Sequence, residues 1–113
     1  MTNIKRLKLA VKMIVDPDLD EFNIVLLEND LNGEDEYLES YKVAIYKTAI
    51  EILEDYKSSY IEKGYKTTDL STVSPKDYIA SIDSTIESYH NKIKRYEEEN
   101  LNKKRNTFVK FIQ

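Results

Sequence analysis

The residues with the most obvious capacity for chemistry are three aspartates near the start of the chain, Asp16, Asp18 and Asp20. Their spacing matches the first, third and fifth positions of an EF-hand loop, which binds Ca²⁺. That loop also requires glycine at its sixth position and glutamate at its twelfth, where this chain has Glu21 and Leu27. The acidic start of a helix explains the pattern better, because the helix dipole favours negative charge there. We therefore expect no metal site and no cofactor.

Catalytic groups are sparse in the rest of the chain. It has no cysteine and a single histidine, His90, which argues against thiolate and multi-histidine metal sites. Two glycines, Gly33 and Gly64, are too few for a loop that cradles phosphate. No serine lies in the sequence context of a nucleophile elbow or an S-x-x-K motif. The sequence thus predicts a protein that is not an enzyme.

Length and composition indicate one helical domain. The chain has 113 residues, of which 34% are charged, and only two glycines and two prolines. No apolar run approaches the roughly 18 residues that a membrane span needs, so we expect no membrane partner. The start "MTNIKRLKLAVKMIV" superficially resembles a signal peptide, but Lys8 and Lys12 interrupt its apolar part. It is better interpreted as an amphipathic helix.

Apolar residues recur at helical spacing in four segments, at about 3–15, 17–30, 34–62 and 75–99. Asp16 and Ser74 are the expected N-caps of the second and fourth helices, each followed by proline at the first helical position. Gly64 is the expected C-cap of the third. The fourth helix carries a heptad seam, formed by Ile79, Ile82, Ile86, Tyr89, Ile93 and Tyr96. The sequence predicts an all-α fold, a small bundle of about four helices, two of them long, with an extended C-terminal tail.

The predicted tail is the most unusual segment. We expect a bundle domain over 1–102 and a separate segment over 103–113, in which a basic hinge precedes an apolar end. The hinge contains Lys103, Lys104 and Arg105, and the apolar end contains Phe108, Val109, Phe111 and Ile112. Because the end is aromatic and β-branched, it could add a strand to the sheet of a partner. Alternatively, it folds back onto its own bundle.

Tyrosines and charges add further candidates for binding. Four of the nine tyrosines fall off the main apolar stripes and are the predicted partner-binding tyrosines: Tyr37, Tyr46, Tyr60 and Tyr65. Segments 1–12 and 103–113 each carry four Lys or Arg, whereas 13–41 contains ten acids and neither Lys nor Arg. Basic residues near Phe108 could grip a nucleic-acid strand, but the net charge of −4 argues against it.

The layout resembles that of the phage head–tail connector proteins, also called head-completion or adaptor proteins. The resemblance rests on the opening "KLAVKMIVDPDLDEF", the long helix "YLESYKVAIYKTAIEILEDY", a polar loop, a late helix and a trailing C-terminal segment. It implies a structural virion protein that is assembled in the bacterial cytoplasm and located in the virion neck. The implied assembly is a ring of about twelve subunits beneath the portal.

The resemblance also implies partners: the portal protein and neighbouring connector or tail-completion subunits. Phe108, Val109, Phe111 and Ile112 would be docking residues, and the loop over 67–74 would contact the ring or the tail. DNA would pass through the ring without sequence-specific binding. Two alternatives stay open, a phage tail-assembly chaperone and a small helical regulatory or nucleic-acid-binding protein.

Overall fold

The computed structural model describes residues 1–11, 18–62 and 75–112, and these form helices joined by irregular segments. The elements are α1 (Asn3–Val11), α2 (Leu19–Glu28), the short 3-10 helix η1 (Glu39–Tyr41), α3 (Lys42–Glu62) and α4 (Pro75–Ile112). Within the described residues there is no strand, and Thr2 and Glu36 form an isolated antiparallel bridge. The predicted all-α bundle of four helices is therefore confirmed.

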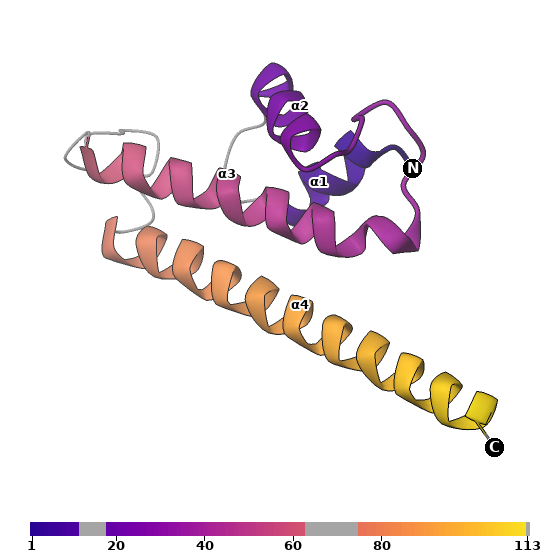
Figure 1. Cartoon of the computed structure of the whole chain (residues 1–113). Coiled ribbons are helices and arrows are strands. Elements are labelled where there is room, and N and C mark those ends of the chain that lie inside the picture. The colour runs from indigo at the N-terminus through magenta and orange to yellow at the C-terminus, as the bar shows by residue number, and fades with distance from the viewer. Residues whose placement is uncertain (12–17, 63–74, 113) are drawn as a thin grey trace.

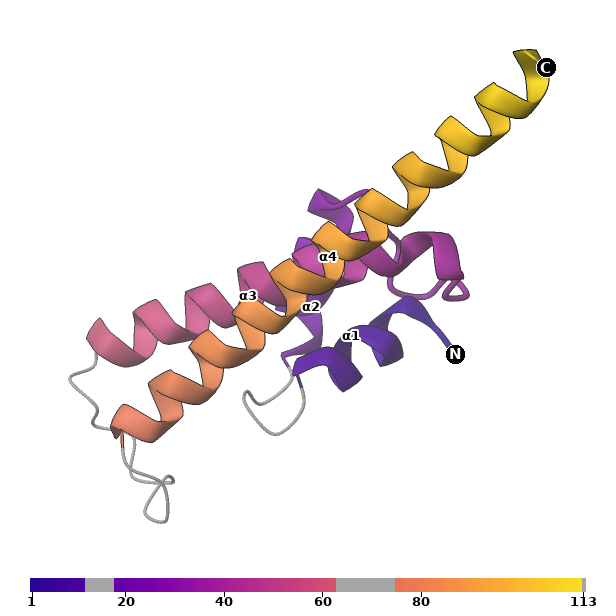
Figure 2. The same ribbon diagram turned by 90° about the horizontal axis from the view of Figure 1, so that it is seen from below.

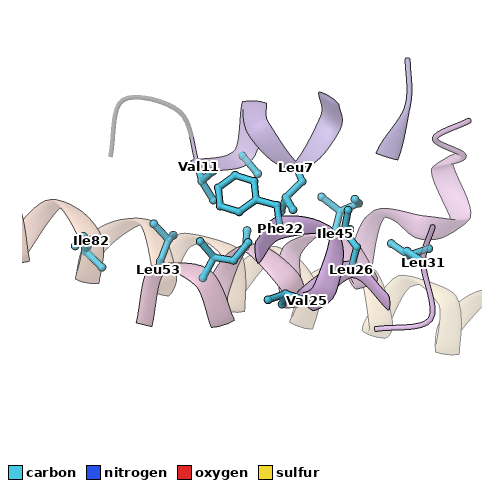
Figure 3. Packing of buried hydrophobic residues seen from close by; sticks show 12 residues of the cluster. Leu7, Val11, Phe22, Val25, Leu26, Leu31, Ile45, Leu53 and Ile82 are labelled. Carbon is cyan, nitrogen blue, oxygen red and sulfur yellow. The ribbon is translucent and has the colours of Figure 1, made fainter. Parts of the chain in front are cut away.

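Helix α3 lies at the centre of the bundle and contacts all three of the other α-helices. Figures 1 and 2 show α1 and α2 on one side of α3 and α4 on the other. The fully buried side chains come from all four helices, as Figure 3 shows: they include Leu7, Val11, Phe22, Leu26, Ile45, Ile52, Leu53 and Ile82. Because its neighbours surround α3, this helix buries more than one of its faces.

The contact between α3 and α4 follows the predicted heptad seam. All six seam residues of α4 are buried or half-buried, and Ile82 and Ile93 are the most deeply buried. Ile93 packs with Tyr46 and Ile50 of α3 in a second, smaller apolar cluster. Near the start of α4, Lys57 Nζ lies 2.6 Å from Asp83 Oδ1 and joins the two helices at the surface. The seam therefore attaches α4 to the bundle up to about Tyr96.

Helix α2 begins later than the sequence suggested and ends in a well-defined motif. Its N-cap is Asp18, whose carboxylate accepts a hydrogen bond from the backbone N–H of Glu21, so the prediction of a cap at Asp16 was wrong. Asp30 has a φ of 64°. The N–H groups of Asp30 and Leu31 donate to the carbonyls of Leu27 and Leu26, which is a Schellman motif with aspartate at the left-handed position.

An irregular segment over 29–38 replaces the predicted first turns of α3. Asn3 is fully buried, and its Nδ2 donates to the carbonyl of Asn32 at 2.9 Å. Gly33 lies so close to α1 and α2 that a Cβ there would collide with Asn23 Oδ1. The predicted start of this helix at residue 34 was wrong, since α3 begins at Lys42 after η1. Backbone pairing with residues 1–4 holds the segment in a non-helical path.

The end of α4 differs most from the sequence prediction. The helix does not stop near Glu99 but runs to Ile112, through the expected hinge and the expected extended tail. No glycine or proline follows Pro75, so nothing in the sequence terminates the helix. Glu99 also precedes Lys103 by four residues, the spacing at which opposite charges stabilise a helix.

The long α4 gives the molecule an elongated shape. Its extents are 64 × 29 × 20 Å and its radius of gyration is 17.2 Å, compared with roughly 13 Å for a compact domain of this length. Figures 1 and 2 show the last turns of α4 projecting beyond α3 and away from the other described elements. We call residues 100–112 the arm; a helix of this length spans about 20 Å.

Candidate partner-binding surfaces

The arm carries seven of the eleven predicted partner-binding residues. Lys103, Lys104, Arg105, Phe108, Val109, Phe111 and Ile112 all lie in it, on helical backbone. The strand-addition mode expected from their β-branched and aromatic types does not fit this conformation. A helical end instead favours the binding mode in which the apolar face of an amphipathic helix enters a groove or lies on another helix.

Helical spacing gives the arm an apolar face of its own. Phe108 and Ile112 follow Leu101 by seven and eleven residues, which places all three within about 20° of one direction around the helix. Leu101 is 52% exposed. By the same spacing, the two nearest seam positions, Ile93 and Tyr96, lie about 80° and about 140° around the helix from Leu101. The arm is therefore not a simple continuation of the seam that holds α4 on α3.

Two of the predicted partner-binding tyrosines are buried inside the chain itself. Tyr46 stacks on Tyr89 of α4, with ring centroids 4.9 Å apart, and is 5% exposed. Tyr60 packs against Tyr78 of α4 at 4.6 Å and is 6% exposed. The prediction treated their face of α3 as free surface, but α4 covers it. Tyr46 and Tyr60 stabilise the α3–α4 contact and are not available to a partner.

The other two predicted tyrosines have different positions. Tyr37 is half-buried in the segment before η1, where it packs against the main core. The guanidinium of Arg6 lies 5.5 Å from its ring centroid, within the range of a cation–π interaction. Tyr65 lies outside the described residues, as do the expected loop over 67–74 and the expected caps Ser74 and Gly64.

Cations and aromatic rings gather where α1, α3 and α4 meet. Arg6 lies 5.7 Å from the ring of Tyr46, and Lys92 lies within 5.7 Å of the rings of both Tyr46 and Tyr89. The hydroxyl of Tyr89 donates to the carbonyl of Ala10 at 2.6 Å. Burial raises the pKa of this hydroxyl above its ordinary value, and the charge of Arg6 partly opposes that shift. The cluster ties the three helices together.

A shallow groove opens beside this cluster. Lys42, Lys92, Arg95, Tyr96, Glu99 and the edge of Tyr46 line it, and its volume is about 370 Å³. Basic residues beside aromatics can bind single-stranded nucleic acid if a base can stack on an open ring. The ring of Tyr46 is buried against Tyr89 and has cations nearby, so it offers no open face for a base. Tyr46 therefore cannot serve as the stacking surface that this mode requires.

The described residues offer no metal site, and His90 is exposed on α4. The EF-hand spacing is accounted for in part by the start of α2. Asp18 is its N-cap and Asp20 lies in its first turn. Asp16 lies outside the described residues.

The outer face of α2 is a surface that the sequence reasoning missed. Phe22, Val25 and Leu26 point into the core (Figure 3), whereas three further apolar residues of α2 are left exposed. These are Leu19, Ile24 and Leu27, at 47%, 57% and 62% exposure. Helical spacing places Ile24 and Leu27 on the side opposite the buried residues, and we call these two the α2 patch. The signal was present in the sequence, because six of the ten residues of α2 are apolar, more than one buried face requires.

None of the described helices combines the length and the apolar character that a bilayer span requires. No protein-family model matches the chain, and no curated protein and no solved structure matches it either. The candidate binding surfaces of the described residues are the arm, the α2 patch and the groove beside Tyr46.

Proposed function

We propose that the chain is a structural assembly subunit, a head–tail connector of a tailed phage, that acts through protein contacts and catalyses no reaction. The observation that carries this proposal is the arm. Helix α4 packs against its own bundle for about 25 residues, and its backbone then continues past the bundle through a stretch that is rich in apolar and basic residues. A helical extension of this composition suits a docking role toward another protein.

The energetics of docking support an assembly role. Burying the apolar side chains at the end of the arm contributes roughly 1.5–3 kcal/mol each before ordering costs. These are Phe108, Val109, Phe111 and Ile112. A helix that is an uninterrupted extension of α4 is already ordered along its backbone, so a partner does not need to fold it first. Affinity is then limited mainly by the fit of the apolar face and by the charges of Lys103, Lys104 and Arg105.

In this role the subunit would occupy the virion neck, after assembly in the bacterial cytoplasm. Its neighbours would be the portal protein and other connector or tail-completion subunits, and the resemblance implies a ring of about twelve copies. Rings grow when one surface of each subunit meets a different surface of the next. A chain with a basic arm and an acidic region over 18–41 has two such different surfaces.

The experiment is native mass measurement of the chain with and without the portal protein of the same phage. We expect a defined ring of subunits on the portal for the full chain. Deleting residues 107–113 should abolish this ring while leaving the melting temperature of the bundle nearly unchanged. Glu51→Gln, at an exposed position on α3, is the matched control and should assemble normally. A full chain that never binds the portal would overturn the proposal.

The same purified protein separates the alternatives. Binding to a tape-measure or tail-tube protein in place of the portal would indicate a tail-assembly chaperone. Salt-sensitive binding to DNA near physiological ionic strength would indicate a nucleic-acid-binding protein. The acidic composition of 18–41 and the covered ring of Tyr46 both argue against the latter.

A further inference from the structure

We infer that the arm of one copy docks on the α2 patch of a second copy, so that identical chains join head to tail. This inference rests on the subunit assembly of the proposed function and names the two surfaces that would meet. The α2 patch is exposed, the backbone of the arm projects beyond the bundle, and the residues of the two segments carry opposite charges.

The α2 patch has the features of a helix-binding site. Ile24 and Leu27 are three residues apart, so they lie side by side on the outward side of α2. Exposed carboxylates surround them: Asp18, Asp20, Glu28 and Asp30. No Lys or Arg occurs between Met13 and Tyr41, so no base on α2 or on the segment after it neutralises this side. An apolar centre with an acidic rim favours a partner with an apolar centre and a basic rim.

The arm matches this description. Leu101, Phe108 and Ile112 share one face by helical spacing. Segment 103–113 contains four bases, Lys103, Lys104, Arg105 and Lys110, and no acid. The two surfaces therefore complement each other in both apolar character and sign of charge.

Geometry makes the contact intermolecular. Helices α2 and α4 lie on opposite sides of α3, and the arm leads away from the bundle in both views (Figures 1 and 2). An arm that continues the axis of α4 cannot return to the α2 patch of its own chain. Because the arm and the patch are different surfaces, each copy can give its arm to one neighbour and receive the arm of another. This arrangement is heterologous and closes into a ring when the rotation between copies permits.

Disulfide cross-linking tests the inference cleanly, because the natural chain has no cysteine. Leu27→Cys and Phe108→Cys are made as separate full-length variants and mixed under mild oxidation. We expect a disulfide-linked dimer in the mixture, at least fivefold above either variant alone, as read by non-reducing gel and intact mass. Two control mixtures should stay at background: Glu51→Cys with Phe108→Cys, and Leu27→Cys with Ser88→Cys. Glu51 and Ser88 are exposed on α3 and on the packed part of α4.

Charge reversal provides a second test, whose result does not depend on the geometry of the two cysteines. Asp20→Lys with Glu28→Lys, in the Leu27→Cys chain, should lower the cross-linked fraction about fivefold. Lys104→Glu with Arg105→Glu, in the Phe108→Cys chain, should do the same. Mixing the two reversed chains should restore cross-linking. Asp20 and Glu28 are exposed on α2, and Lys104 and Arg105 lie on the arm. Circular dichroism verifies that each variant folds.

The outcomes separate this inference from the proposed function when the cross-linking is repeated in the presence of portal. Cross-linking between positions 27 and 108, free or on the portal, supports the inference even if the portal itself proves not to be the partner. A ring on the portal without this cross-link overturns the inference and leaves the connector function standing. Absence of both ring and cross-link overturns both. Cross-linking of Phe108→Cys with itself at the same yield would indicate contact between two arms and would also overturn the inference.

Discussion

The packed and the projecting parts of α4 have similar amounts of apolar side chain but different surroundings. Residues 75–99 place a heptad seam against α3, and Ile82 in this seam is completely buried. The arm continues the same helix, yet its apolar residues follow another direction and no other described element lies beside it. Helical continuity and burial are therefore separate properties. The first follows from the absence of helix breakers, and the second needs a partner surface.

The largest difference in unfolding free energy should come from comparing a proline in the packed part of α4 with a proline in the arm. Proline removes a backbone hydrogen bond and clashes with the preceding turn, at a cost of about 3 kcal/mol or more inside a packed helix. Asn91 and Asn102 are both exposed, so Asn91→Pro and Asn102→Pro are matched changes. We expect Asn91→Pro to destabilise the bundle by that amount and Asn102→Pro to cost less than about 1 kcal/mol. Chemical denaturation followed by circular dichroism measures both, and equal costs would show that the arm is part of the cooperative fold.

Truncating one side chain in the packed part of α4 and one in the arm should also change the unfolding free energy by unequal amounts. Ile82→Ala leaves a cavity between α3 and α4 and should cost about 2–5 kcal/mol of unfolding free energy. Phe108→Ala should change the unfolding free energy by less than about 0.5 kcal/mol, because the backbone of the arm projects beyond α3 and away from the other described elements. It should instead weaken assembly on the portal. A Phe108→Ala chain that melts as early as Ile82→Ala would contradict the separation of the two parts.

Tyr89 gives a smaller and pH-dependent effect in the packed part. Tyr89→Phe removes the hydrogen bond to the carbonyl of Ala10 and should cost about 1 kcal/mol at neutral pH. Burial raises the pKa of Tyr89 in the folded state, so folding favours the protonated hydroxyl. Its contribution is therefore complete below the unfolded pKa of about 10 and declines as the pH rises toward the folded value. The stability difference between the natural chain and Tyr89→Phe should narrow above that pH, and a widening difference would disprove the assignment.

The smallest effect should come from the surface ion pair between α3 and α4. Lys57 and Asp83 are both partly exposed, so Asp83→Asn should cost no more than about 0.5 kcal/mol. Thermal melts at low and high salt measure it, because salt screens an exposed pair. A cost near that of Ile82→Ala would mean that charge, and not the apolar seam, holds α4 in place.

Local patterns were sufficient to predict much of the fold. The seam from Ile79 to Tyr96 was identified correctly because a heptad repeat is a property of one helix and its spacing. The start of α4 at Pro75 was predicted because proline favours the first position of a helix. The start of α3 could not be predicted from local patterns. The bridge between Thr2 and Glu36 holds the backbone near residue 36 in a conformation that competes with helix.

The candidate surfaces were harder to predict. Tyr46 and Tyr60 were predicted to be surface residues because the apolar pattern of one helix does not reveal how many other helices pack against it. The basic run from Lys103 to Arg105 was interpreted as a hinge on composition alone, although no residue there breaks a helix.

The uninterrupted junction between the packed part of α4 and the arm has a mechanical consequence. Because the helix is continuous and has no flexible joint between these parts, the direction of the arm is determined by how the seam packs on α3. A substitution such as Ile93→Val, far from any partner, could tilt the arm by a few degrees without touching its chemistry. In a closed ring such a tilt would alter the curvature and hence how many copies complete the circle, while the strength of each joint stayed the same.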